Sequence, residues 1–235
     1  MPEFRLTQIS DTHLGRRMTP LLDNFARVSE YIDMKRPDLV VNSGDISFDG
    51  PGQFDDLEFA RMLHGAFPVA CRYLPGNHDI GDNPTAVGPA PKQPVTEQSL
   101  KAYLSVFGED RWRFDAAGWC FIGLNSLIMN TELASEAEQF DWLASQLSDS
   151  QGKPVALFLH KPIFLKAPND PELAAPRSVT YRCRRGADWW TCCAPSICGS
   201  SPAATSTSAG ISPLPTPVTF GRLPPGSSFP MPGRK

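Results

Sequence analysis

Residues 74–79 read Leu-Pro-Gly-Asn-His-Asp, and the interpretation of the whole chain depends on this stretch. It follows the apolar run 69–73, so three polar side chains come where a buried strand gives way to a Pro-Gly turn. A turn of this kind can direct polar side chains into the crevice beyond the carboxyl ends of a sheet. Taken alone, the stretch fits a functional site and a simple polar turn equally well. The chain on either side distinguishes the two.

The succession of apolar strand, polar tip and helix occurs three times between residues 4 and 107. Residues 4–10 form the first predicted strand and lead into Asp11-Thr12-His13, and residues 38–42 form the second and lead into Ser43-Gly44-Asp45. Apolar positions between residues 21 and 34 predict the first helix, and Phe59, Met62 and Leu63 predict the apolar face of the second. This alternation predicts an α/β fold with right-handed crossovers and its polar tips at one edge.

The chain beyond residue 80 predicts a second group of elements. A loop rich in glycine and proline (81–95) is expected over the edge with the polar tips, followed by a helix near 97–107. Two strands of a hairpin-like unit are expected around 112–114 and 119–125, and a helix at 136–147. A last buried strand, 154–159, leads directly into His160.

The polar tips use three of the four histidines in the chain, and each tip follows an apolar strand closely. One aspartate after a strand is usually a cap or a turn residue. A set of such tips at one edge favours a metal site instead. The residues of the set are Asp11, His13, Asp45, Asn77, His78, Asp79 and His160. The fourth histidine, His64, lies in a predicted helix away from the tips and is expected to be structural.

Two divalent ions about 3.5–4 Å apart can clamp a phosphoryl group and lower the pKa of a bridging water. Such a pair needs a bridging carboxylate, together with imidazole, amide or carboxylate ligands for each ion. Asp45 is the natural bridge. Asp11 and His13 suit one ion, and Asn77 and His160 suit the other.

His78 and Asp79, the remaining two residues of the set, are not assigned to a metal ion. His78 is expected to contact the phosphate or to protonate the leaving group. Its neighbour Asp79 is expected to orient the His78 ring, as a carboxylate beside a histidine often does.

In their order and wording, these motifs resemble those of the calcineurin-like metallophosphoesterases. The matching motifs are Asp11-x-His13, Gly44-Asp45, Gly76-Asn77-His78-Asp79 and His160, and the likeness covers roughly residues 4–172. The phrase at 74–79 looks most like the bacterial branch related to cyclic-nucleotide and glycerophosphodiester phosphodiesterases. The resemblance implies two mixed sheets packed as a sandwich and flanked by helices in four layers. It also implies a dinuclear centre of Fe, Mn, Zn or Co, and hydrolysis of phosphodiesters or phosphomonoesters.

The C-terminal part departs from that family pattern. The family normally ends with Gly-His-x-His, which supplies one further histidine to each metal, but no histidine follows His160. Residues 1–175 are therefore predicted to form a truncated metallophosphoesterase domain with an incomplete second sheet. Residues 176–235 are rich in Cys, Ser, Pro, Thr and Arg and lack apolar periodicity, so an aberrant or disordered tail is predicted.

The genetic code suggests that this tail is read out of frame. Joining the third base of each codon to the first two of the next turns Asp188-Trp189-Trp190-Thr191 into Leu-Val-Asp, whatever synonymous codons are used. In the same frame, residues 203–208 permit Gly-His-Val-His-Gln. A natural disordered tail is the alternative, and an uninterrupted, well-supported gene sequence across residues 174–188 would establish it. If the frame is shifted, the missing histidines are expected to impair activity.

Composition excludes several other classes. The formal net charge is −3 and the pI about 5.8, so no general attraction for nucleic acid or anionic membranes is expected. No secretory signal is visible, and no run approaches the ~20 apolar residues of a membrane span. A cytoplasmic enzyme acting on a small phosphate ester is predicted, and the oligomeric state stays open. The rival predictions are a non-catalytic scaffold with the same fold and a dinuclear ureohydrolase, although residues 76–79 are not the signature of the latter.

Overall fold

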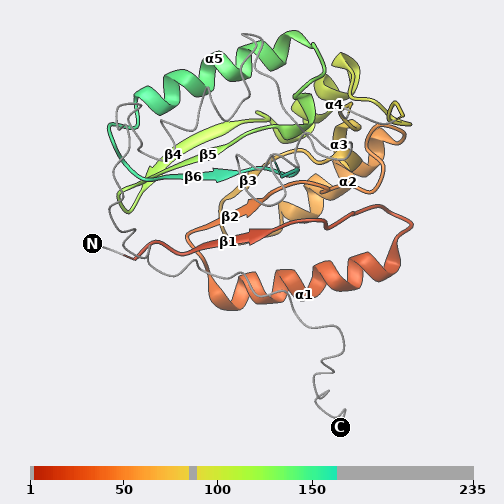
Figure 1. Ribbon diagram of the computed structural model, residues 1–235. Coiled ribbons are helices and arrows are strands. Elements are labelled where there is room, and N and C mark those ends of the chain that lie inside the picture. Colours follow the sequence, from red (N-terminus) through yellow and green to blue (C-terminus); the bar gives the residue numbers. More distant parts are fainter. Residues whose placement is uncertain (1–2, 85–88, 163–235) are drawn as a thin grey trace, which may run out of the picture. The chain divides into compact units, whose positions relative to one another are not determined.

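The computed structural model describes residues 3–84 and 89–162 (Figure 1). The strands are β1 (Leu6–Ile9), β2 (Leu39–Asn42), β3 (Cys71–Tyr73), β4 (Trp112–Ala116), β5 (Trp119–Gly123) and β6 (Val155–Phe158). The α-helices are α1 (Thr19–Lys35), α2 (Phe54–His64), α3 (Asn77–Ile80), α4 (Glu97–Phe107) and α5 (Ala134–Ser148), with a 3₁₀ turn at Ser126–Ile128. The predicted tail and its boundary at residue 175 lie outside the described residues.

The six strands form two three-stranded sheets. The first has the order β1-β2-β3 and is parallel throughout, because a helix carries the chain from each strand to the next. The second has the order β4-β5-β6, with β4 and β5 antiparallel and β5 and β6 parallel. The predicted α/β architecture of two sheets flanked by helices is confirmed. Within the described residues, only the second of the two sheets is mixed.

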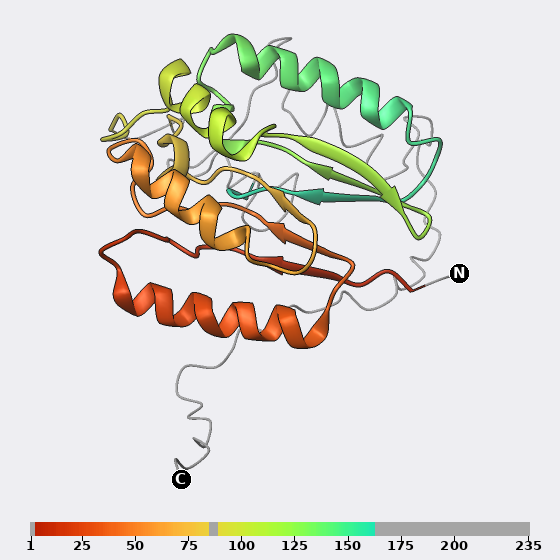
Figure 2. The same cartoon turned by 180° about the vertical axis from the view of Figure 1, so that it is seen from behind.

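The two sheets lie face to face (Figures 1 and 2). Side chains alternate along the strands between the space between the sheets and the helices outside. In β2, Leu39 and Val41 point into the core between the sheets, whereas Val40 points to the helices. All of these side chains are buried, as expected for the middle strand of a parallel sheet. The indole Nε1 of Trp112 in β4 donates to the carbonyl oxygen of Tyr73 in β3 at 2.9 Å and so ties the sheets together.

Helices cover the outer faces and complete the four layers. Helices α1, α2 and α4 bury side chains against the first sheet, and α5 packs Leu143 and Leu147 against the second. Among residues 3–84 and 89–162, no helix combines the length and apolar character needed to cross a bilayer.

Helix α2 buries a different face from the predicted one. Leu57, Ala60 and His64 point inward, and Leu63 of the expected face also packs against the core. Met62 is 57% exposed and Phe59 only half-buried, so the expected face is wrong at Met62. Apolar residues surround more than half of this helix, and the neighbouring elements decide which of them are buried. The unexpected member of the buried face is His64, which is 1% exposed.

Burial of His64 predicts a loss of stability in mild acid. Removal from water lowers the pKa of His64 to about 4, although the carbonyl oxygen of Ala60 opposes the change. In the unfolded chain the pKa is near 6.5, so between these values the unfolded state binds more protons. The free energy of unfolding should therefore fall by up to about 3 kcal/mol as the pH drops from 7 to 4. Urea denaturation across this range measures the effect, and His64→Gln should show a clearly flatter profile. Equal pH dependence in both proteins would contradict this assignment.

Candidate metal centre

The tips of β1 and β2 run side by side beyond the ends of their strands. The backbone N–H groups of Asp11, His13 and Leu14 donate to the carbonyl oxygens of Gly44, Asp45 and Ile46 at 2.9, 2.9 and 2.8 Å. Because β1 and β2 are parallel, both tips leave the sheet at the same edge. The structure thus brings together residues that the sequence separates by more than thirty positions.

Three of the predicted ligands have left-handed backbone conformations. The φ angles are +57° at Asp11, +44° at His13 and +53° at Asp45. Non-glycine residues adopt such angles uncommonly and at some cost, and these residues cluster at functional sites. Here the conformation turns successive side chains of the two tips toward the same space.

Asp45 lies between two histidines, each facing a different carboxylate oxygen. Its Oδ2 is 3.6 Å from Nε2 of His13, and its Oδ1 is 3.4 Å from Nε2 of His160. The backbone N–H of His78 also donates to Oδ1, at 2.9 Å. Asp45 is only 5% exposed, so these contacts fix its position. This geometry suits a carboxylate that binds one ion through each oxygen.

On the Oδ1 side, His160 joins Asn77. The Nδ1–H of His160 donates to the carbonyl oxygen of Ser43 at 3.2 Å, which leaves a lone pair on Nε2 of the neutral ring. That nitrogen lies 3.3 Å from Oδ1 of Asn77, in addition to its approach to Asp45. A nitrogen lone pair and two oxygens therefore converge without a donor among them. A divalent cation fits this donor set.

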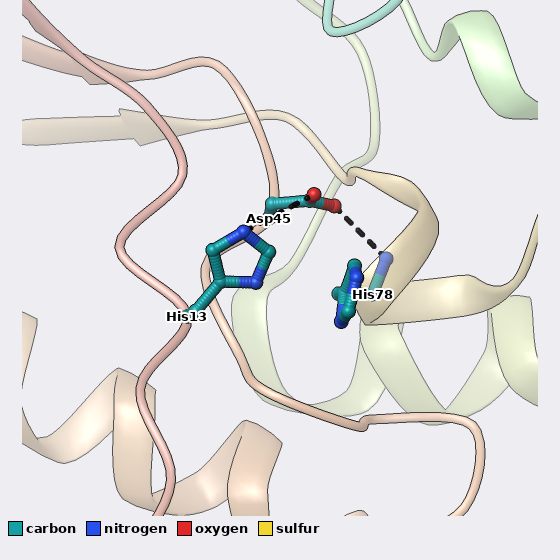
Figure 3. A group of neighbouring side chains, drawn as sticks. All are labelled: His13, Asp45 and His78. Carbon is teal, nitrogen blue, oxygen red and sulfur yellow. Dashed lines mark hydrogen bonds and ion pairs between the residues drawn. The ribbon is translucent and has the colours of Figure 1, made fainter. Parts of the chain in front are cut away.

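His78 lies beside His13 and Asp45 (Figure 3). One ligand atom from each of these residues lies within 4.8 Å of the others. The Nδ1–H of His78 donates to the carbonyl oxygen of Phe48 at 2.6 Å, so the lone pair of the neutral ring is on Nε2. The His13 and His78 rings meet edge to face, 4.4 Å between centroids. His78 is thus close enough to bind the same ion as His13, besides its predicted contact with phosphate.

Asp11 lies on the open side of this half of the site. Its side chain is 61% exposed, and its Oδ1 is 3.9 Å from Nε2 of His13. The hydroxyl of Ser10 donates to its other carboxylate oxygen. Asp11 can therefore reach an ion beside His13, from the direction of solvent.

Asp79 is buried beneath the site rather than facing it. Its carboxylate accepts from the backbone N–H groups of Ile46, Ser47 and Gly76 and from the Ser47 hydroxyl, at 2.7–3.1 Å. Burial raises the pKa of Asp79, and these donated hydrogen bonds act against that rise. The contact expected between Asp79 and the His78 ring is made by the Phe48 carbonyl oxygen instead. Asp79 joins the tip of β2 to α3.

Two glycines permit the close approach of these tips. A Cβ on Gly76 would lie 2.2 Å from both the backbone nitrogen and Oδ1 of Asp45. A Cβ on Gly44, where φ is +118°, would lie 2.5 Å from Nδ1 of His160. The sequence motifs included both glycines. The carbonyl oxygens of Ser43 and Phe48, which orient His160 and His78, carry no sequence signal because every residue has one.

Replacing Gly76 by alanine should displace Asp45 and weaken the centre. With the new Cβ at 2.2 Å from the carboxylate, either the turn or Asp45 must move. We expect Mn²⁺ affinity to fall by about 10–100-fold, the range seen when groups supporting a ligand are lost. Calorimetric titration with Mn²⁺ measures this. Gly65→Ala is the matched control, since Gly65 follows α2 with an ordinary φ of −64°. Equal affinity in the two variants would show that Gly76 does not hold Asp45 in place.

Comparison with known proteins identifies a family. A family model described as calcineurin-like phosphoesterase matches residues 4–192. The glycerophosphodiester phosphodiesterase GpdQ of Enterobacter lignolyticus is 28% identical over 171 residues, 67% of this chain and 56% of that protein. The 3′,5′-cyclic adenosine monophosphate phosphodiesterase CpdA of Vibrio vulnificus is 34% identical over 105 residues, 40% of this chain and 37% of that protein. The chain thus spans little more than half the length of the first relative.

A solved structure shares the fold. The crystal structure of a dimetal phosphatase from Danio rerio superposes with a TM-score of 0.50 at 16% identity, covering 69% of this chain and 71% of that one. The family model extends over most of the sequence and includes every candidate ligand. The chain therefore belongs to the calcineurin-like phosphoesterase family, whose members are metal-dependent hydrolases of phosphoric esters.

Proposed function

We propose that the chain hydrolyses phosphodiesters or phosphomonoesters with two divalent ions, Fe, Mn, Zn or Co, held on either side of Asp45. The observation that carries the proposal is the position of the Asp45 carboxylate, which faces His13 with one oxygen and His160 with the other. If Asp45 only formed a structural ion pair, one histidine would be enough, and if it only stabilised a turn, no histidine would be needed. Two imidazoles on opposite oxygens of one buried carboxylate are what a bridged pair of ions requires.

The residues divide into two ligand groups with Asp45 common to both. The first ion would be held by Asp11 and His13, and the second by Asn77 and His160. When bound, such ions lower the pKa of water and offset the charge that develops in an in-line displacement at phosphorus. The remaining chemistry falls to the protein, which must position the ester and handle the leaving group.

His78 has two possible roles that differ in protonation. As a neutral ring with its proton on Nδ1, it offers a lone pair at Nε2 and can bind the ion beside His13. As an imidazolium it can donate from Nε2 to a phosphate oxygen or a departing alkoxide. In both roles the Phe48 carbonyl oxygen orients the ring. Asp79 acts as a positioning residue, because it is fully buried and cannot touch a substrate.

A phosphodiester is the favoured substrate class. GpdQ and CpdA are both named for phosphodiester substrates, and both are similar to this chain. A small ester, rather than nucleic acid or a membrane surface, agrees with the net charge of −3. Cytoplasmic location stays a prediction from the sequence.

The test measures metal binding and hydrolysis together in the full chain. We expect calorimetry to detect Mn²⁺ binding, and a chromogenic phosphodiester to be hydrolysed slowly. A chelator should abolish the hydrolysis and Mn²⁺ should restore it. Hydrolysis that persists after complete removal of metal would contradict the proposal.

A non-catalytic scaffold is the second candidate, supported by the absence of any histidine after His160. A scaffold keeps the fold and binds a partner through its surface, so it needs no bridging carboxylate. Asp45→Ala would then leave partner binding intact. Failure of the full chain to bind Mn²⁺ at all would favour this candidate over the enzyme.

A further inference from the structure

A buried polar pair lies where β2 and α2 end, and the hydrogen bonds that its side chains make within the described residues go to His64 or Asn42, Gly44 and Ala60 rather than to a candidate ligand. Asn42, the last residue of β2, and His64, the last residue of α2, are 0% and 1% exposed. The Nδ2 of Asn42 lies 3.0 Å from Nε2 of His64. The rings of Phe25, Phe67 and Tyr73 surround His64, so water does not compete for this hydrogen bond.

The hydrogen bonds of the pair permit only one arrangement of protons. The carbonyl oxygen of Ala60 can only accept, so Nδ1 of His64 donates to it, at 2.9 Å. In the neutral ring Nε2 then holds a lone pair and accepts from Nδ2 of Asn42. This fixes which end of the amide faces the helix. The Asn42 Oδ1 must point the other way, where it accepts from the backbone N–H of Gly44 at 3.1 Å.

The bond from Gly44 to Asn42 closes the tight turn that ends β2. A side-chain oxygen that accepts from the backbone two residues later stabilises such a turn. Within it, the carbonyl oxygen of Ser43 accepts from Nδ1 of His160, and Gly44 packs directly against the His160 ring. The next residue is Asp45. Asn42 is therefore linked to His160 through the Ser43–Gly44 turn, and it precedes Asp45 by three residues.

We propose that the Asn42–His64 pair is a positioning device that holds the Ser43–Gly44 turn, and through it His160 and Asp45, in the geometry for metal binding. Helix α2 supplies no ligand to the centre, yet it sets the geometry of the centre through its last residue. The proposal deepens the proposed function, because positioning His160 and Asp45 matters only if they bind metal. The low pKa of His64 agrees with it, since the ring stays neutral at the pH where a hydrolase works.

The first arm of the test needs no metal. The chain has four histidines, so single replacements assign every ring signal in an NMR spectrum. In the metal-free protein we expect His160 to show a protonated Nδ1, bonded to the Ser43 carbonyl oxygen. His64→Leu and Asn42→Ala should each shift this signal and broaden it, whereas Ile32→Ala should not. Ile32 is an equally buried core residue near the C-terminal end of α1, at the opposite end of the first sheet.

The second arm measures Mn²⁺ affinity by calorimetry alongside the melting temperature. His64→Leu and Asn42→Ala should weaken Mn²⁺ binding by about 10–100-fold. Ile32→Ala should lower the melting temperature by a similar amount but change affinity less than twofold. His64→Gln should recover most of the affinity, because Oε1 can accept from Asn42 where Nε2 did.

The two arms separate the two claims. If the unaltered chain binds no Mn²⁺, the proposed function fails, and the His160 signal still decides the positioning role. An unchanged His160 signal in His64→Leu overturns the inference, even if that variant is less stable. So does a loss of affinity in Ile32→Ala as large as that in His64→Leu, because the effect would then come from general destabilisation.

Discussion

Replacing Asp45 by asparagine should abolish Mn²⁺ binding on both sides of the centre and reduce hydrolysis to the background rate. Asparagine keeps the shape and can still accept from the His78 backbone N–H, but it carries no charge and only one oxygen. A bridging ligand belongs to both ions, so its loss should exceed the ~10–100-fold typical of supporting groups. We expect at least a hundredfold loss of affinity, with both binding steps affected in the calorimetric titration.

The control for this variant is Asp115→Asn. Asp115 lies in β4 of the second sheet and pairs with Lys153 and Arg113, away from the tips. The same chemical change there should leave Mn²⁺ affinity unchanged. If Asp45→Asn lost only one of two binding steps, the carboxylate would serve one ion and not bridge. If it lost neither, the assignment of the centre would be wrong.

The strands were the most predictable part of the fold. In the first sheet, β2 is a short apolar run that ends in polar residues, and apolar residues in or beside β1 and β3 mark the other two strands. This pattern is visible without any knowledge of the neighbouring strands. The face of α2 was not predictable, because apolar residues surround most of that helix. Only packing against the other elements of the core selects Leu57 and Ala60 over Met62, and two of these elements, α1 and α4, are separated from α2 by other parts of the chain.

The convergence of several candidate residues was also predictable, because Asp11, His13, Asp45 and Asn77 follow parallel strands that end at one edge of the first sheet. The contacts between ligands were not. Asp79 follows His78 directly, yet α3 turns it toward the backbone of residues 46–47, and Phe48 holds the His78 ring instead. Because Asp79 follows His78 in sequence, it was the expected partner of the His78 ring, but the short helix α3 directs the two side chains apart. A carbonyl oxygen as partner cannot be read from residue types.

The role of His64 could not be predicted from the sequence either. A single histidine in a helix is usually structural, and its sequence neighbours connect it to no motif. Its relation to the centre runs through Asn42, which has no distinguishing pattern in the sequence either. Only the fold shows that the ends of β2 and α2 meet next to the turn that precedes Asp45.

Restoring the predicted reading frame of the tail should increase hydrolysis by at least about a hundredfold. Asp11, His13 and Asp45 would hold one ion and Asp45, Asn77 and His160 the other, so each ion would have only three protein ligands among these residues. The frame that reads residues 203–208 as Gly-His-Val-His-Gln adds two histidines. By the family resemblance, one of them completes each set.

The restored chain also separates the two roles of His78. In the chain as it stands, His78 lies within reach of the ion beside His13 and can substitute for the missing ligand. His78→Ala should then weaken Mn²⁺ binding. In the restored chain an added histidine takes that position, so the same substitution should reduce turnover of a chromogenic phosphodiester and leave Mn²⁺ affinity nearly unchanged.

The control is the restored chain with both added histidines replaced by alanine, which should return to the low activity. Equal activity with and without those histidines would refute the impairment. An equal effect of His78→Ala on affinity in both chains would make His78 a metal ligand in its own right.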